Sequence, residues 1–124
     1  MIIEHANLTV SDVAASVAFY QAVFDFAVRW EGSAREMDGP VKAVHLGDTA
    51  TYLSLFESQK KGRAPADYDA PGLNHIGFEV EDVDGYRSRL EALGVEIHLE
   101  GDYEPGRRIY FYDPDGIEVE LVEY

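Results

Sequence analysis

The stretch HIGFEVEDV, residues 75–83, repeats a pattern that the chain already carries near its beginning. Residues 5–13 read HANLTVSDV, so that in both stretches a histidine comes first and a valine stands five positions later. Asp-Val closes both motifs after one further residue. A motif that recurs in this way indicates two structural modules of one kind within the chain.

Both motifs run into a segment in which apolar residues recur every three or four positions, the spacing of an amphipathic helix. The two segments with this spacing are residues 12–24 and 82–94. Ser11 or Asp12 is suited to cap the first helix and Asp82 the second, because a short polar side chain can accept hydrogen bonds from the first backbone N–H groups. Gly94 is suited to end the second helix.

β-rich sequence follows each helix, so each half of the chain reads as a strand, a helix and three further strands. The strands expected after the helices are residues 27–30, 42–46 and 52–56 in the first half and 96–100, 108–112 and 118–122 in the second. The polar residues 58–72, which include Gly and Pro, read as an exposed linker. We therefore expect an α+β fold in a single domain, residues 1–124, with βαβββ modules at about 1–57 and 73–124.

The alternation of side chains along a strand predicts where the two histidines point. Leu8 and Val10 share one face of the first strand, so His5 lies on the other. The same alternation separates His75 and Glu120 from the apolar residues of their own strands. Because the apolar face of each strand covers the helix of its module, both histidines and the glutamate should face away from the helices.

Two neutral imidazoles and a carboxylate supply the lone pairs that a divalent cation needs, and they leave coordination positions open for water or substrate. Taken singly, His5 and His75 fit a hydrogen-bonded structural role, and Glu120 fits a solvated one. The repeat and the shared face favour a joint metal site formed by these three residues. Histidine and carboxylate donors suit Fe, Mn, Co, Ni or Zn, so the identity of the metal is left open.

The chain resembles the vicinal oxygen chelate superfamily, which includes glyoxalase I, extradiol dioxygenases, and the fosfomycin- and bleomycin-resistance proteins. The resemblance extends over the whole chain and is carried by His5 with LTVSDVAASVAFYQAVF, by NHIGFEVEDVDG with His75, and by the closing FYDPDGIEVELVEY with Glu120. It implies a cupped eight-stranded mixed sheet with the helices on its outer face and a metal on His5, His75 and Glu120. It also implies a homodimer, and it leaves open whether one site draws its ligands from one chain or from two.

One departure from the family pattern concerns glyoxalase I, whose site has a fourth ligand, a glutamate on the last strand of the first module. Aligning residues 53–55 with residues 119–121 puts Ser54 in the place of that ligand. Glu57 follows three residues later and is expected on the opposite face. Glyoxalase I chemistry needs a carboxylate at this position to move a proton beside the metal, so we do not expect that activity.

The expected function is a metal-dependent enzyme that acts on a small molecule chelating the metal through adjacent oxygens, by dioxygenase, lyase or isomerase chemistry. The alternative is a non-catalytic ligand-sequestering protein of the bleomycin-resistance type. A phosphonate substrate fits poorly with so acidic a chain. The residues expected to line the substrate pocket are Tyr52, Ser54, Phe56, Arg108 and Tyr110, and no catalytic residue is assigned. His45 and His98 have no counterpart at a ligand position and read as ordinary polar residues.

The composition of the 124-residue chain excludes several classes of partner. Its formal net charge of −14 repels nucleic-acid phosphates. No apolar stretch approaches the roughly 20 residues of a membrane helix, and no basic segment leads into an apolar run as in a signal peptide. The absence of cysteine excludes disulfides and thiolate ligands and fits a reducing compartment, so we expect a cytoplasmic protein.

Overall fold

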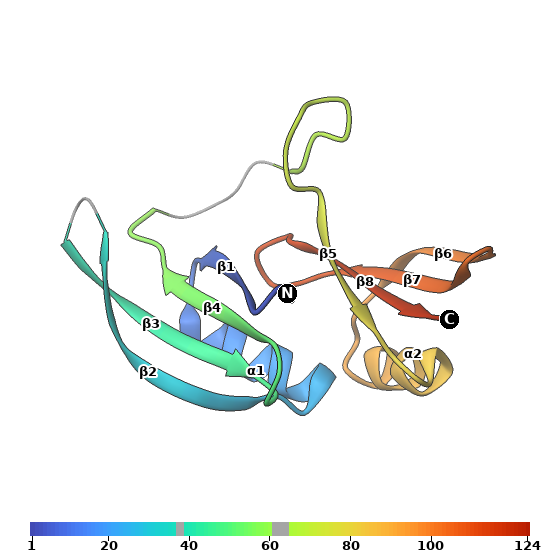
Figure 1. Ribbon diagram of the computed structural model, residues 1–124, viewed down its shortest axis with the longest axis horizontal. Helices are drawn as coiled ribbons and strands as arrows, with labels where there is room; N and C mark the ends of the chain where they lie inside the picture. Colours follow the sequence, from blue (N-terminus) through green and yellow to red (C-terminus); the bar gives the residue numbers. More distant parts are fainter. Residues whose placement is uncertain (37–38, 61–64) are drawn as a thin grey trace. The chain divides into compact units, whose positions relative to one another are not determined.

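Each half of the chain folds into a strand, a helix and three further strands in the computed structural model, which describes residues 1–36, 39–60 and 65–124. The chain divides into two compact units, Met1–Gly62 and Arg63–Tyr124, each with its own sheet and helix (Figure 1). The part of the expected linker at residues 61–64 lies outside the described residues.

The two units have the same order of elements and the same sheet topology. The elements of the first unit are β1 (His5–Val10), α1 (Val13–Phe24), β2 (Ala27–Glu36), β3 (Gly39–Gly47) and β4 (Tyr52–Glu57). Those of the second unit are β5 (His75–Glu79), α2 (Val83–Ala92), β6 (Ile97–Tyr103), β7 (Gly106–Tyr112) and β8 (Glu118–Glu123). The strands are ordered β1-β4-β3-β2 and β5-β8-β7-β6, with a parallel first pair in each sheet. The predicted α+β class and the two βαβββ modules are confirmed, while the joining of both sheets into one cup stays a prediction.

The second and third strands of the first unit are longer than the sequence predicts. β2 and β3 pair in an antiparallel hairpin from Ala27–Gly47 to Glu36–Gly39. The expected strands covered only residues 27–30 and 42–46, because polar residues, Gly and Pro stand between them. Backbone hydrogen bonding continues through these residues, since a hairpin ladder depends on the main chain rather than on a buried face.

One helix covers one face of each sheet, α1 over β3 and β4, and α2 over β7 and β8 (Figure 1). Apolar, fully buried side chains of both helix and sheet form the core of each unit, among them Tyr20 and Leu46 in the first unit and Leu90 and Phe111 in the second. Burying these side chains supplies most of the driving force for folding each unit. None of the helices in the described part of the chain is long and apolar enough to span a membrane.

The N-terminus of each helix is held by two carboxylates of its own module. The N-caps are Asp12 and Asp82, and each accepts a hydrogen bond from the backbone N–H three residues later, at 3.0 and 2.9 Å. Glu57 and Glu123, at the ends of β4 and β8, accept a second bond from the first helical N–H, at 3.1 and 2.8 Å. Gly94, with a φ of +70°, follows the second helix as the sequence predicts.

Removing the N-cap of α2 by Asp82→Ala should lower the free energy of unfolding by about 1 kcal/mol, because one backbone N–H loses its acceptor. Urea unfolding followed by circular dichroism measures this change. Glu81→Ala, which removes the neighbouring exposed carboxylate, is the matched control and should change the free energy by less than about 0.5 kcal/mol. Equal stability of the two variants would contradict the capping role.

Candidate metal centre

His75 and Glu120 come together on the parallel strand pair β5–β8 of the second unit. The register places Gly77 opposite Glu120. Because Gly77 has no side chain, the Glu120 carboxylate lies over it, with Oε2 3.5 Å from where a Cβ on Gly77 would stand. This brings Oε2 of Glu120 to 2.9 Å from Nε2 of His75.

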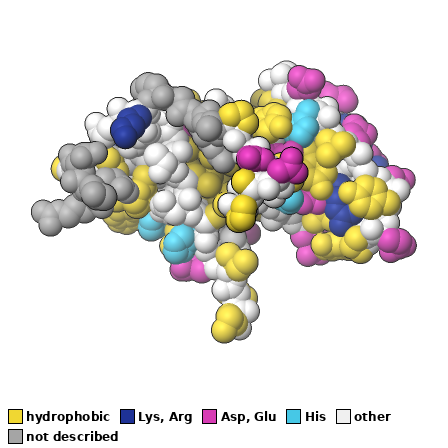
Figure 2. Space-filling view, turned by 90° about the horizontal axis from the view of Figure 1, so that it is seen from above, with side chains coloured by type: hydrophobic (Ala, Val, Ile, Leu, Met, Phe, Trp, Pro, Cys, Tyr) yellow, Lys and Arg dark blue, Asp and Glu magenta, His cyan; other side chains and the backbone are white. Residues whose placement is uncertain are grey.

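The separation of these two atoms fits two neighbouring ligands of one ion. A transition metal about 2.1 Å from each of two ligand atoms, at a right angle, holds them about 3.0 Å apart. The side chains of His75 and Glu120 are 32% and 12% exposed, so a small solute can reach them. Figure 2 shows histidine side chains at the surface among hydrophobic ones. The donor set of the second unit is therefore suited to a divalent cation.

Arg108 and Tyr110, on the neighbouring strand β7, contact the same carboxylate. Nε of Arg108 donates to Oε1 of Glu120 at 2.9 Å, on the oxygen that does not face His75. Burial, together with a hydrogen bond to Glu120, raises the pKa of Tyr110 to about 12. The ring of Tyr110 also stands edge-on to that of His75, with centroids 5.8 Å apart. Both residues, predicted as substrate contacts, orient Glu120 in this structure.

A second group of polar side chains lies on the Nδ1 side of the His75 ring and consists of Tyr68, Glu118 and His98. The hydroxyl of Tyr68 is 3.2 Å from Nδ1 of His75 and donates to Glu118, and this bond to Glu118 raises the pKa of Tyr68 to about 12. The other oxygen of Glu118 is 3.1 Å from Nε2 of His98. Sequence reasoning missed this group because Tyr68 stands in the polar linker. His98, predicted to be an ordinary polar residue, pairs with a carboxylate that is only 7% exposed.

His5 belongs to the first unit, where its ring stacks on Tyr52 with centroids 4.9 Å apart. Nδ1 of His5 lies 2.9 Å from the carboxylate of Glu4. That hydrogen bond is the main reason why the pKa of Glu4 is lowered. The ring of Tyr52 also meets that of His45, with centroids 4.7 Å apart, and burial lowers the pKa of that histidine. His5 thus contacts a carboxylate through Nδ1, whereas His75 contacts Glu120 through Nε2.

Ser54 occupies the position in β4 that Glu120 occupies in β8. Ser54 pairs with Asn7 in the first sheet as Glu120 pairs with Gly77 in the second, which confirms the predicted alignment. The Ser54 side chain is buried and accepts a hydrogen bond from the Asn7 amide at 3.2 Å. Glu57 points to the opposite face, where it binds the start of α1. The first unit therefore has no carboxylate on β4 at the fourth ligand position.

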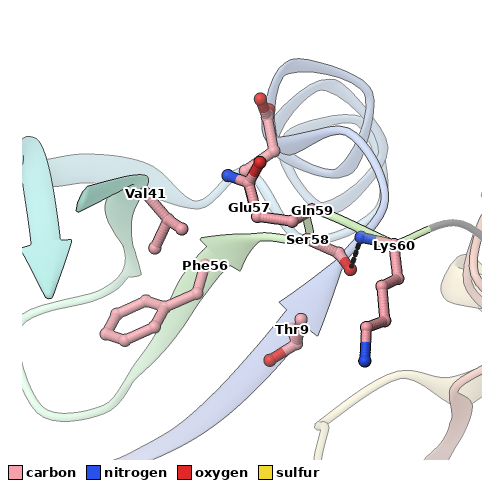
Figure 3. A pocket seen from close by; sticks show the side chains of 7 residues that line it. All are labelled: Thr9, Val41, Phe56, Glu57, Ser58, Gln59 and Lys60. Atoms are coloured by element: carbon pink, nitrogen blue, oxygen red, sulfur yellow. Dashed lines mark hydrogen bonds between the residues drawn. The ribbon is translucent and has the colours of Figure 1, made fainter. Parts of the chain in front are cut away.

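Phe56, predicted to share a substrate pocket with Tyr52, lines a separate small cavity of about 160 Å³ at the end of β4 (Figure 3). The lining residues are Thr9, Val41, Phe56, Glu57, Ser58, Gln59 and Lys60. In Figure 3 the backbone N–H of Lys60 donates to the Ser58 hydroxyl, at 2.9 Å. Tyr52 is not among the lining residues, so the predicted pocket residues of β4 divide between the neighbourhood of His5 and this cavity.

Within residues 1–36, 39–60 and 65–124, no group of three or more His, Asp or Glu side chains is placed to hold a metal ion. His75 and Glu120 contact each other in the second unit, and His5 lies in the first.

A comparison with protein-family models identifies the chain. Residues 2–121 match the model described as the Glyoxalase/Bleomycin resistance protein/Dioxygenase superfamily. The chain belongs to this superfamily. The predicted resemblance to vicinal oxygen chelate proteins is therefore confirmed. The two βαβββ modules, each of which begins with a histidine on its first strand, are the structural features that carry this resemblance.

Similar proteins include a metallothiol transferase and a fosfomycin resistance protein whose mutant was crystallised with Mn(II). The chain is 29% identical to the uncharacterized protein YaeR of Escherichia coli, over 98% of this chain and 95% of that one. It is 31% identical to the metallothiol transferase FosB of Bacillus licheniformis, over 96% and 73%. A crystal structure of a mutant FosX, a fosfomycin resistance protein of Listeria monocytogenes, with Mn(II) and 1S,2S-dihydroxypropylphosphonic acid aligns with a TM-score of 0.75 at 30% identity, over 98% and 93%. These relatives fit the predicted metal-dependent action on small molecules.

Proposed function

We propose that the protein is a metal-dependent enzyme of the vicinal oxygen chelate type, with a divalent ion held by His5, His75 and Glu120. The observation that carries this proposal is the 2.9 Å approach of Nε2 of His75 to Oε2 of Glu120. The Mn(II) complex of FosX favours manganese among Fe, Mn, Co, Ni and Zn as the first ion to test.

The residues around Glu120 define what the site does to a substrate. When bound, the ion acts as a Lewis acid on two adjacent oxygens of the substrate. Arg108 forms an ion pair with Oε1 of Glu120, which balances the charge of the carboxylate and keeps Oε2 directed at His75. Tyr110 keeps its proton at neutral pH and donates it in a hydrogen bond to Glu120.

The substrate that we propose is a small molecule with two adjacent oxygens, and the reaction is one of the lyase, isomerase, dioxygenase or transferase type. Ser54, in the place of a fourth carboxylate, argues against glyoxalase I chemistry. The name of FosX, a fosfomycin resistance protein, points to fosfomycin as the first compound to assay. A phosphonate would have to draw Arg108 away from Glu120, since the neighbouring Arg87 and Arg107 pair with Glu100 and Asp84.

Metal analysis of the purified protein, after loading with Mn²⁺ and removal of free ions, tests this function. We expect about one ion per chain in the wild-type protein and none in His5→Ala or His75→Ala. His45→Ala is the matched control, a histidine of the first sheet outside the proposed ligand set, and should keep its ion. An ion retained by either ligand variant would overturn the assignment, and a wild-type protein that binds none of the five metals would overturn the function.

We propose further that the protein is a cytoplasmic homodimer. The sheets end in edge strands, β1 and β2 in the first and β5 and β6 in the second, and a second chain can cover such an edge. Mixing unfolded His5→Ala and His75→Ala chains and refolding them together extends the metal analysis. If one site takes ligands from both chains, about a quarter of the wild-type occupancy returns, since half of the dimers are mixed and each holds one complete site. If each site lies within one chain, none returns.

A further inference from the structure

His75 stands in a hydrogen-bonded series that reaches from Glu120 on one side to Glu118 and His98 on the other. Glu120 meets Nε2 of the ring at 2.9 Å, and the hydroxyl of Tyr68 meets Nδ1 at 3.2 Å. Tyr68 also bonds to Glu118, and Glu118 to His98. The two nitrogens of His75 therefore each have a carboxylate within reach, one directly and one through a tyrosine.

The directions of these hydrogen bonds follow from the groups themselves. The carboxylate of Glu118 has no hydrogen to donate, so the Tyr68 hydroxyl donates to it. The hydroxyl oxygen can then accept a hydrogen bond from Nδ1 of His75, 3.2 Å away, when that nitrogen carries the ring proton. A neutral imidazole carries one ring proton, so a proton on Nδ1 leaves a lone pair on Nε2.

The partner at Nδ1 matters because Glu120 competes for the same proton. Without an acceptor at Nδ1, the ring would carry its proton on Nε2, where Oε2 of Glu120 lies in hydrogen-bond range. A cation would then have to displace that proton before it could bind. Tyr68, bonded to Glu118, supplies an acceptor for that proton on the Nδ1 side of the ring.

Glu118 and Tyr68 are themselves held in place by neighbouring groups. Glu118 is 7% exposed and is held by His98, whose ring stacks on Tyr112 with centroids 4.3 Å apart. Tyr68 stands in a turn that is closed by two hydrogen bonds to Asp67. The Asp67 carboxylate accepts one from the backbone N–H of Asp69 at 2.9 Å, and the Asp67 backbone carbonyl accepts the other from the N–H of Ala70 at 3.1 Å. The turn directs a mostly exposed tyrosine onto a buried carboxylate.

We infer that Tyr68 and Glu118 are positioning residues that fix the Nδ1-protonated form of His75 and so direct Nε2 toward a divalent ion. The inference rests on the proposed function, because it gives His75 the role of a ligand. The first unit has the same arrangement in simpler form, since Nδ1 of His5 faces the Glu4 carboxylate directly. Outer partners of this kind typically change metal affinity by about 10–100-fold.

The Tyr68→Phe variant tests this inference, because it keeps the ring and removes only the hydroxyl. Mn²⁺ titration by calorimetry should show an affinity lower by about 10–100-fold. Nitrogen-15 NMR of His75 in the metal-free protein should show a proton on Nδ1 in the wild type and its loss from Nδ1 in Tyr68→Phe. Tyr86→Phe, a tyrosine of the same unit that lies on α2 with its ring against Arg89, is the matched control and should match the wild type in both measurements.

The two readouts separate this inference from the proposed function. A wild-type protein without a proton on Nδ1 of His75, or a Tyr68→Phe variant with wild-type Mn²⁺ affinity, would overturn the positioning role while leaving the metal site intact. A wild-type protein that binds no metal but carries the proton on Nδ1 would overturn the proposed function. In that case Tyr68 still fixes the protonated nitrogen of His75, but His75 is not a metal ligand. The inferred effect of Tyr68 on metal affinity is then overturned together with the proposed function.

Discussion

The Glu120→Gln variant is expected to bind Mn²⁺ at least about 100-fold more weakly than the wild-type protein. Glutamine has the size of glutamate but offers a neutral amide in place of an anionic ligand. If the amide NH₂ group faces His75, it donates to Nε2 and occupies the lone pair that the metal needs. Loss of the charge also leaves Arg108, which is 11% exposed, without its ion-pair partner.

Two measurements on this variant separate metal binding from folding. Calorimetric titration gives the affinity, and urea unfolding without metal gives the stability, which should fall by about 1–3 kcal/mol through the effect on Arg108. Glu79→Gln is the matched control, an exposed carboxylate at the end of the strand that begins with His75, and should leave both quantities unchanged. Unchanged Mn²⁺ affinity in Glu120→Gln would remove Glu120 from the ligand set.

The largest loss of stability is expected for Phe111→Ala, about 3–5 kcal/mol. Phe111 is fully buried on β7, in the strand that also carries Arg108 and Tyr110. Its removal costs the transfer free energy of the ring and leaves a cavity between the sheet and α2. Since domains of this size are stable by only about 5–15 kcal/mol, this one change removes a large fraction of the total.

Urea unfolding followed by circular dichroism measures the effect of Phe111→Ala. Leu99→Ala is the matched control, because Leu99 lies on the neighbouring strand β6 but is 53% exposed, and its replacement should cost less than about 1 kcal/mol. Similar losses for the two variants would mean that the core of the second unit does not lie between β7 and α2.

Local periodicity was sufficient to predict which face each histidine occupies. Leu8 and Val10 are buried and His5 is exposed, as the alternation of side chains requires. The prediction succeeds because the direction of a strand side chain depends on its own backbone and not on the neighbouring strand. The strand lengths in the β2–β3 hairpin were wrong for the opposite reason, since pairing between strands extended them through polar residues.

The environment of the predicted site residues was less accessible to sequence reasoning. Arg108 and Tyr110 were expected to contact a substrate, yet both contact Glu120. Phe56 lines a cavity apart from Tyr52. These outcomes depend on strand register, on side-chain conformation and on which charged groups form ion pairs. None of these has a signature in the order of residues along one strand.

The sequence by itself determined the two βαβββ modules, the side of its own strand on which each of His5, His75 and Glu120 lies, and the absence of a carboxylate at Ser54, because a repeated motif and strand alternation are local properties. Only the tertiary structure decided that Glu120 reaches His75 across Gly77, and that Tyr68 holds the other side of the same ring. The physical reason is that hydrogen bonds act over about 3 Å, between residues that only strand pairing and a turn of the linker bring together.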